Sequence, residues 1–201
     1  MKYRWKLHQH LTLYEKYFKL DEFSVSHELY GGGSSPVFTR ELFERGSVVA
    51  VLPYDPERRK VVLIEQFRVG AVAVADVDGP WLIESVAGVI EDGESTQDVA
   101  MREAEEEAGC HIRQLHLTSR YYVSPGGTSE HCTSYCGLID SKGLGGIHGL
   151  TEENEDILVM VVDAEEAFGW VREGKIRSSA TIIALQWLEL NEPRIIERYA
   201  G

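Results

Sequence analysis

Three glutamates, Glu103, Glu106 and Glu107, stand close together in the run EAEEEAG. At about 100° per residue they share one arc of a helix, while Glu105 points away from it. Like charges on neighbouring turns repel, and acids are unfavourable near the negative end of the helix dipole. A divalent cation would relieve this repulsion, and carboxylate oxygens suit Mg²⁺, Mn²⁺ or Ca²⁺ better than zinc. The same acids are also common on solvated helix surfaces, so the run alone is not specific.

The helix that carries these glutamates is predicted over residues 96–108. Ser95 followed by Asp98 resembles a capping box with Asp in place of Glu, and Gly109 suits the left-handed position after a helix. A narrow stripe of small residues would let the helix lie close against a sheet; it comprises Ala100, Ala104 and Ala108. The local chemistry therefore predicts both ends of the helix and its buried side.

The rest of the chain reads as strands around this helix, with helices at the end. Residues 3–30 alternate polar and apolar, which predicts antiparallel strands with one wet face. SVVAVLPYD and KVVLIEQFR predict two paired buried strands, and WLIESVAG predicts one short strand. Further strands are expected at 114–123, 131–139 and 155–163, and DAEEAFGWVREGKI and SSATIIALQWLEL have helical spacing, with Gly174 as a stop between them. A strand-rich part to about residue 47 thus precedes a mixed α/β domain.

The glycine-rich segment 141–154 is predicted to be a loop, because it has little apolar pattern. Loops of that length inside compact domains are usually functional or disordered.

Composition narrows the class of protein. The net charge of −13 disfavours nucleic acid and anionic membranes as partners. Three sparse cysteines argue against a disulfide framework and fit a reducing compartment. The sequence has no apolar run long enough for a transmembrane helix, and its start lacks the features of a signal peptide. We therefore expect a cytoplasmic location.

The spacing around the glutamates is more specific than the acids themselves. It matches the Nudix box, G-x5-E-x7-R-E-U-x-E-E-x-G-U, whose fixed positions are held by Gly88, Glu94, Arg102, Glu103, Glu106, Glu107 and Gly109. The two positions for a bulky aliphatic residue hold Ala104 and Cys110 instead. Arg102 neighbours Glu106 on the helix and is expected to orient it. The sequence therefore resembles the Nudix hydrolases.

The resemblance extends to one branch of that family, the bacterial ADP-ribose pyrophosphatases. Segments such as VVLIEQFR, SPGGTSE and GIHGLTEENEDI are similar to that branch, which the chain resembles over residues 10–190. Pro125, sixteen residues beyond Gly109, is the mark associated with ADP-ribose preference.

This resemblance implies a fold, an activity and an assembly. The fold class is α+β: a Nudix fold, an α/β/α sandwich with a mixed sheet, over residues 48–201. A small antiparallel β domain, residues 1–47, would precede it and serve dimerisation and substrate contacts. The implied reaction is Mg²⁺-dependent hydrolysis of ADP-ribose to AMP and ribose 5-phosphate, with Mn²⁺ as a substitute ion. The implied assembly is a homodimer.

The resemblance also assigns roles to residues near the box and in the glycine-rich segment. The metal ligands would be the Ala87 carbonyl and the carboxylates of Glu103, Glu107 and Glu155, and Glu106 would lie close enough to share a further ion. Glu153 matches the general base, and Glu152 beside it is a rival. Without the resemblance, these loop acids would be read as solvated.

Substrate contacts follow from the same comparison. Tyr17 and Phe18 match an aromatic position that stacks on adenine, although both also fit a sheet core. Arginine forks suit phosphate, but each arginine also fits a surface salt bridge. Glu130 matches a residue that contacts the terminal ribose from the other subunit. The remaining predicted contacts are Arg40, Glu41, Arg45 and Arg68.

Two other functions stay open at this point. The same fold and metal could serve another nucleoside diphosphate sugar, such as GDP-mannose. A Nudix-like module could also bind ADP-ribose without cleaving it, although such modules tend to lose box glutamates, and all are present here.

Overall fold

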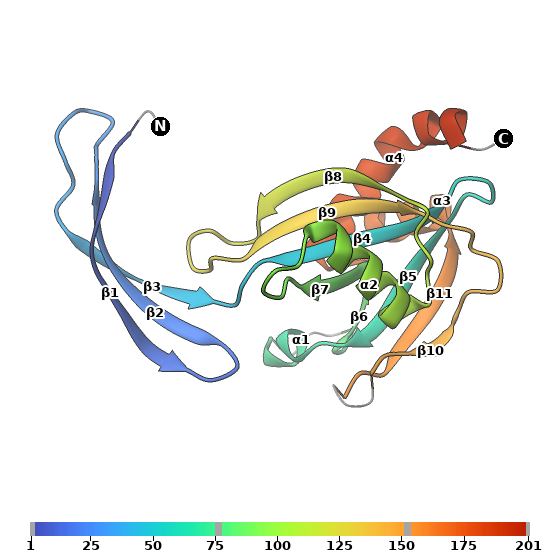
Figure 1. Ribbon diagram of the computed structural model, residues 1–201, viewed down its shortest axis with the longest axis horizontal. Coiled ribbons are helices and arrows are strands. Elements are labelled where there is room, and N and C mark those ends of the chain that lie inside the picture. Colours follow the sequence, from blue (N-terminus) through green and yellow to red (C-terminus); the bar gives the residue numbers. More distant parts are fainter. Residues whose placement is uncertain (1–2, 75–77, 151–153, 200–201) are drawn as a thin grey trace. The chain divides into compact units, whose positions relative to one another are not determined.

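The computed structural model describes residues 3–74, 78–150 and 154–199 (Figure 1). The chain divides into two compact units. Unit 1 comprises Met1–Ser47 with Tyr122–His131, and unit 2 comprises Val48–Tyr121 with Cys132–Gly201.

Unit 1 contains an antiparallel sheet in the order β1, β2, β3, three strands among the described residues. Their bounds are Trp5–Glu15, Lys19–His27 and Phe38–Glu44. The predicted antiparallel strands within residues 3–30 are confirmed as β1 and β2, and β3 was not expected. The segment 122–131 joins this unit through the backbone: Phe43 N donates to Gly127 O at 2.8 Å, and Ser129 N donates to Phe43 O at 3.3 Å.

Unit 2 is built on a mixed sheet of eight strands within the described residues. Its path runs β10, β11, β5, β4, β9, β8, with β6 added to β5 and β7 added to β4. The bounds are β4 Val48–Asp55, β5 Lys60–Phe67, β6 Trp81–Glu84, β7 Val86–Val89, β8 Gln114–Tyr122, β9 His131–Leu138, β10 Gly146–His148 and β11 Ile157–Asp163. β4 pairs in parallel with β9 and antiparallel with β5 and β7, so the predicted mixed sheet is confirmed.

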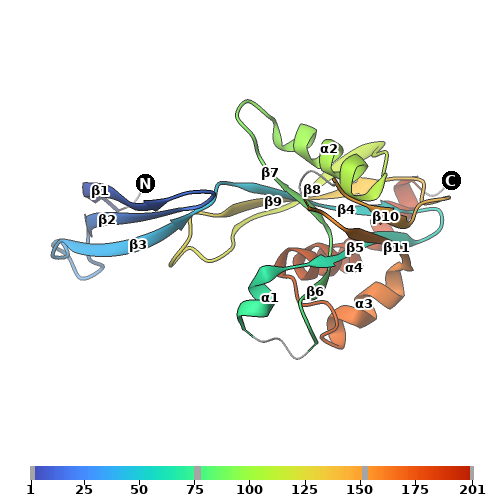
Figure 2. The ribbon, with the colours of Figure 1, turned by 90° about the horizontal axis from the view of Figure 1, so that it is seen from below.

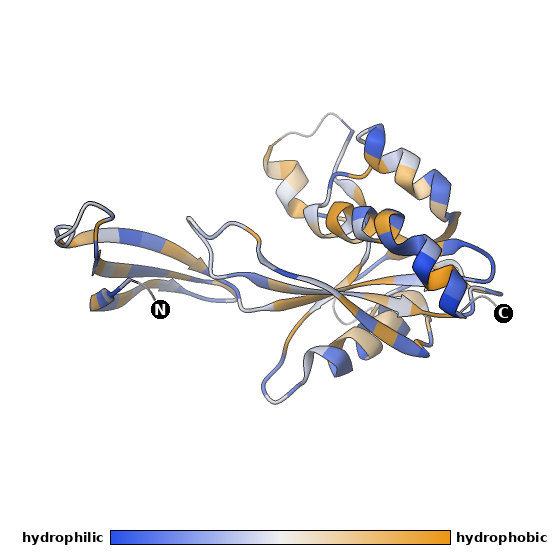
Figure 3. Ribbon diagram, turned by 90° about the horizontal axis from the view of Figure 1, so that it is seen from above, coloured by the Kyte–Doolittle hydropathy of each residue, from blue (hydrophilic) through white to orange (hydrophobic). Residues whose placement is uncertain are grey.

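Helices cover both faces of this sheet (Figure 2). The helices are α1 Val69–Ala73, α2 Thr96–Ala108, α3 Ala164–Arg172 and α4 Ser179–Tyr199. One core cluster joins α2 to the sheet and the other joins α3 and α4 to its opposite face. Hydrophobic and hydrophilic residues alternate along the helices (Figure 3), as expected where one side of each helix is buried. The α+β layered architecture expected from the sequence is therefore confirmed.

The prediction of a single strand over WLIESVAG is wrong, because the segment forms two strands. β6 pairs with β5 and β7 pairs with β4, so the chain crosses from one neighbour to the other at Ser85. Ser85 N donates to the Thr181 hydroxyl at 2.8 Å, a contact with α4 instead of a strand. The strand break thus depends on residues far away in the sequence.

Three further elements differ from expectation. α1 was not expected, and β10 forms inside the segment predicted to be a loop. α4 extends past the predicted helical segment and includes Pro193. Its later residues are held to the sheet, because buried Glu192 accepts hydrogen bonds from Tyr54 Oη at 2.8 Å and Arg59 Nη2 at 2.7 Å.

Asp55, at the end of β4, anchors the turn to β5 and the segment that follows β9. Its buried carboxylate accepts hydrogen bonds from Ser141 N at 2.9 Å, Ser141 Oγ at 2.7 Å and Arg58 Nη1 at 3.0 Å. Burial alone would raise the pKa of this carboxyl, but the hydrogen bonds from Ser141 and Arg58 outweigh it and lower the pKa to about 2. The charged form of Asp55 therefore stabilises the fold.

We expect Asp55→Asn to lower the free energy of unfolding at pH 7 by about 2 kcal/mol. Because the folded pKa is depressed, this contribution is fully present above the unfolded pKa, 3.8, and is lost as pH falls towards about 2. Urea unfolding at pH 7, 4 and 2.5 measures it, with Asp92→Asn, at an exposed acid, as the control. A difference between wild type and Asp55→Asn that stays constant down to pH 2.5 would contradict the assignment.

Candidate active site

Helix α2 spans the predicted residues, and its ends have the predicted chemistry. Asp98 N donates to Ser95 Oγ at 3.2 Å, and Gly109 has a φ of 61° after the last helical residue. The small-residue stripe is fully buried against the sheet; it comprises Ala100, Ala104 and Ala108. This packing holds the glutamates beside the stripe at the edge of the core.

Glu107 is the most deeply placed of the box acids. Its side chain is only 4% exposed, and its Oε2 accepts a hydrogen bond from Ala87 N at 3.1 Å. Burial, together with the charges of Glu103 and Glu155, raises the pKa of Glu107 to about 8, although the Ala87 N–H and Arg68 oppose the rise. The charges of Glu103, Glu155 and Arg68 therefore all act on the Glu107 carboxyl.

Glu103 lies directly over Gly88 of β7. A Cβ atom added to Gly88 would stand 1.7 Å from Glu103 Oε1, so only glycine leaves room for this carboxylate. Burial raises the pKa of Glu103, the nearby Arg102 opposes this, and the charges of Glu106 and Glu155 add to it. The glycine that opens the box motif therefore has a steric role in placing one of its acids.

Arg102 holds the outer part of the acid cluster. Its guanidinium binds Glu94 through two bonds of 3.0 and 3.1 Å, Glu103 at 2.8 Å and Glu106 at 3.1 Å. The expected contact with Glu106 is confirmed, and the structure adds Glu94 and Glu103. Glu94 had no role assigned from the sequence, although its place in the box was a signal for one.

Glu155 reaches the same region from the segment before β11. Its backbone N donates to Leu150 O, and its side-chain Oε2 accepts from Leu150 N, both at 3.2 Å. Gly149 allows this close approach, because a Cβ there would stand 2.8 Å from the Glu155 Cβ. The predicted base Glu153 and its rival Glu152 lie outside the described residues.

The donor set suits a hard divalent cation. Buried carboxylates that raise one another's pKa are stabilised by a positive ion, and all of the acids here offer oxygen ligands. Within the described ranges, no three His, Cys, Asp or Glu side chains are already close enough together to hold a metal ion. The Glu103 carboxylate instead pairs with Arg102, as noted above.

Arg68 is the predicted substrate contact that lies at this site. It follows β5, and its Nε binds Glu84 Oε2 of β6 at 2.6 Å. Its charge lowers the pKa of Glu107, so the guanidinium and the buried carboxyl act on each other. Glu84 had no sequence signal for this contact, because the pairing of β6 with β5 places it there.

The other predicted substrate contacts belong to unit 1. Phe18 packs edge-on against Phe43, and the Arg45 guanidinium lies 5.6 Å from the Phe18 ring centroid. Arg45 Nη1 lies 3.4 Å from Glu130 Oε2, so the structure brings Phe18, Arg45 and Glu130 together. Tyr17 is 87% exposed and stands edge-on to Phe18.

Arg40 and Glu41 also lie on β3, three and two residues before Phe43, the residue that packs against Phe18. Arg40 Nη1 donates to Thr39 O at 2.7 Å and its guanidinium covers the Phe38 ring, while Glu41 pairs with Glu22 across the sheet.

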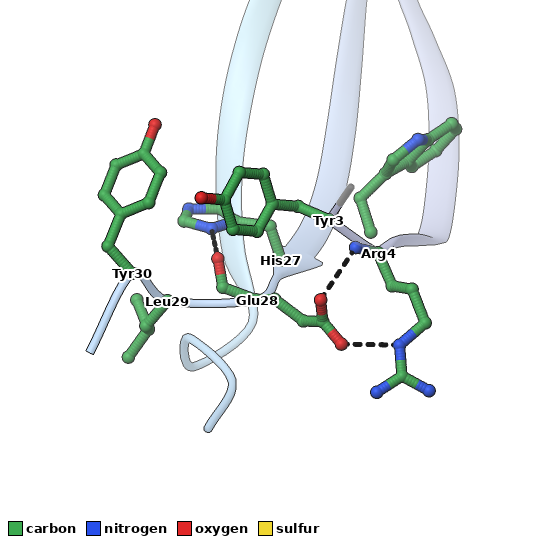
Figure 4. Close-up of a pocket in the computed structure, with 7 residues that line it drawn as sticks. Tyr3, Arg4, His27, Glu28, Leu29 and Tyr30 are labelled. Carbon is green, nitrogen blue, oxygen red and sulfur yellow. Dashed lines mark hydrogen bonds and ion pairs between the residues drawn. The ribbon is translucent and has the colours of Figure 1, made fainter. Parts of the chain in front are cut away.

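A pocket of about 260 Å³ also lies in unit 1 (Figure 4). Its lining contains no predicted site residue and comprises Tyr3, Arg4, Trp5, His27, Glu28, Leu29 and Tyr30. The lining of this pocket therefore includes none of the acids Glu103, Glu107 and Glu155.

Comparisons with known proteins agree with this geometry. A family model described as the NUDIX domain matches residues 44–194. The ADP-ribose pyrophosphatase of Escherichia coli (strain K12) is 48% identical over 189 residues, which cover 94% of this chain and 90% of the relative. The ADP-ribose pyrophosphatase of Haemophilus influenzae is 47% identical, covering 90% of this chain and 83% of the relative.

The chain is also similar to a more distant relative and to a solved structure. The GDP-mannose pyrophosphatase of Cronobacter sakazakii is 38% identical, covering 75% of this chain and 78% of the relative. A solved structure described as an ADP compounds hydrolase superposes with a TM-score of 0.70 at 17% identity, covering 98% of this chain and 97% of that one. At that identity, the superposition supports the shared fold alone.

In the described part of the chain, no helix is both long and apolar enough to cross a membrane.

Proposed function

This chain belongs to the Nudix family of pyrophosphohydrolases, and we propose that it hydrolyses the pyrophosphate bond of ADP-ribose to give AMP and ribose 5-phosphate. The observation that carries the proposal is the placement of two box acids at the edge of the core: Glu107 is buried and bonded to Ala87 N, and Glu103 lies over Gly88. The charge of Glu155, from a distant segment, acts on both carboxyls. The high identity to relatives named ADP-ribose pyrophosphatase supports the choice of substrate.

We propose that Mg²⁺, with Mn²⁺ as a substitute, is held by Glu103, Glu107, Glu155 and the Ala87 carbonyl. When bound, the ion would offset the charge of the pyrophosphate and favour attack by water. The Ala87 N–H holds the Glu107 carboxylate in place, and Arg102 does the same for Glu103. Arg68 supplies a fixed positive charge for a phosphate oxygen, and Glu153 accepts the proton of the attacking water.

Unit 1 supplies the proposed nucleoside and ribose contacts. Aromatic faces at Tyr17 and Phe18 suit adenine, and the Glu130 carboxylate accepts hydrogen bonds from sugar hydroxyls. Arg40, Glu41 and Arg45 complete the proposed set.

Residues 1–47 would also mediate a homodimer, with residues 48–201 forming the hydrolase domain. Light scattering is expected to give twice the chain mass of 22.6 kDa; a single-chain mass would contradict the dimer. The proposed location is the cytoplasm.

The function is tested by incubating the protein with ADP-ribose and separating the products by chromatography. AMP and ribose 5-phosphate are expected with Mg²⁺, and neither product with EDTA. GDP-mannose and other nucleoside diphosphate sugars form the comparison panel, because a relative of this chain is named GDP-mannose pyrophosphatase. A preference for GDP-mannose would support the second enzyme function, and binding of ADP-ribose without cleavage would support a sensing module.

The role of Glu153 has its own test. Glu153→Gln is expected to lower kcat by about 10²-fold or more and to change KM little, because a missing base affects the transition state more than binding. Glu152→Gln, at the adjacent acid, is the matched control and should retain near-normal kcat. If the two effects are reversed, Glu152 is the base.

A further inference from the structure

Gln66, at the end of β5, is a buried polar residue with an unpaired donor. Its side chain is 6% exposed, and its Nε2 has no hydrogen-bond partner among the residues that the structure describes. Burying an amide N–H without a partner destabilises a protein, so most such groups are paired. A donor left unpaired at this position requires an explanation.

The alternation of β5 shows which side of the sheet Gln66 faces. Val61 and Leu63 belong to the core cluster with α3 and α4, whereas Val62 and Ile64 belong to the cluster with α2. Successive side chains of a strand point to opposite faces. Gln66 therefore faces the same side as α2, the helix that carries Glu103 and Glu107.

The position of Gln66 near the end of β5 relates it to two residues that act on the carboxyl of Glu107. Arg68, two residues further on, influences the carboxyl of Glu107. Glu65 pairs with Leu158 in the antiparallel ladder of β5 and β11, so Gln66 lies level with the start of β11, two residues after Glu155. No oxygen of the described residues accepts a hydrogen bond from Gln66 Nε2.

We propose that Gln66 is a substrate-binding residue whose Nε2 N–H donates to an oxygen of the pyrophosphate. The proposal rests on the proposed function for the class of ligand, and on the buried unpaired donor for the residue. A pyrophosphate oxygen is a charged acceptor that would satisfy the donor only in the complex. The Gln66 amide is neutral, so it can donate a hydrogen bond to the pyrophosphate without disturbing the ion pair between Arg68 and Glu84.

The test compares wild type with Gln66→Leu, which has a similar size but no donor. We expect kcat/KM for ADP-ribose to fall about 10- to 100-fold, because a hydrogen bond to a charged group is lost. Calorimetry with imidodiphosphate, a non-hydrolysable pyrophosphate mimic, in Mg²⁺ should show a weakening of similar size. Tm should stay unchanged or rise, because the unpaired buried donor has been removed.

Two matched variants separate substrate binding from a structural role. Thr181→Val removes a buried hydroxyl that accepts from Ser85 N at 2.8 Å, so it should lower Tm without changing imidodiphosphate affinity. Gln97→Leu, at an exposed glutamine of α2, should change neither quantity. A Gln66→Leu variant that behaves like Thr181→Val, with lower Tm and unchanged affinity, would overturn the proposal.

Failure of the proposed function would look different. A wild-type protein that binds imidodiphosphate but does not cleave ADP-ribose contradicts that function, while the affinity ratio of wild type to Gln66→Leu still decides the role of Gln66. Unchanged affinity and kcat/KM in Gln66→Leu, or no imidodiphosphate binding to wild type, contradicts the role of Gln66.

Discussion

Glu107→Gln is expected to lower kcat for ADP-ribose by roughly 10³-fold, which corresponds to about 4 kcal/mol in the barrier. The substitution keeps the size of the side chain and removes a charge next to the proposed Mg²⁺ site. Steady-state kinetics with saturating Mg²⁺ measure the effect. Glu105→Gln, on the exposed side of the same helix, is the matched control and should retain full activity.

The fold should survive this change, and its stability has a defined pH dependence. The folded pKa of Glu107 is raised to about 8 from 4.5, so the folded protein binds this proton more tightly than the unfolded chain does. Wild type therefore loses stability as pH rises from 4.5 towards 8, and a neutral glutamine does not share that loss. In metal-free buffer, Tm of Glu107→Gln should equal or exceed that of wild type at pH 8.

Two outcomes would contradict the expected effect of Glu107→Gln on kcat or its cause. Near-normal turnover by Glu107→Gln would remove α2 from the active site, and with it the proposed mechanism. Lost turnover together with a collapsed near-UV circular dichroism spectrum would instead indicate a folding defect.

Gly88→Ala is expected to lower kcat/KM by about 10²-fold, because a methyl group there displaces the Glu103 carboxylate. The added Cβ would stand 1.7 Å from Glu103 Oε1 and 2.1 Å from Glu103 Cδ, far inside contact distance. Tm should fall as well, since the side chain or the β7 backbone must shift. Kinetics and thermal unfolding of the same preparation measure both effects.

Two further variants identify the cause. Gly70→Ala is the control, because an added Cβ at Gly70 meets nothing within 4 Å. The double variant Gly88→Ala, Glu103→Ala removes the clashing side chain and should recover Tm without recovering activity, a non-additive result for residues in contact. Unchanged Tm and activity in Gly88→Ala would show that the Glu103 carboxylate does not occupy that space.

The amino-acid sequence by itself determined helix α2 and the acids on it. Both helix ends depend on local chemistry: a Ser95 hydroxyl that caps one end, and a left-handed Gly109 at the other. The spacing of Glu103 and Glu107 places them beside the alanine stripe because a helix has a regular period. The box motif then pointed to a Nudix hydrolase, because many fixed positions match at once.

The tertiary structure alone decided which distant groups meet those acids. Glu155 comes near α2 through the pairing of β11 with β5, and Glu84 reaches Arg68 because the segment after Ser85 changes strand partner. The motif alone gave no reason for glycine at position 88. The position of Glu103 in the structure gives one, because a side chain at position 88 would clash with the Glu103 carboxylate. The unpaired donor of Gln66 could not be read from a β-strand sequence either. Helix ends and periodicity depend on neighbours along the chain, whereas strand partners, burial and hydrogen-bond satisfaction depend on residues that only folding brings together.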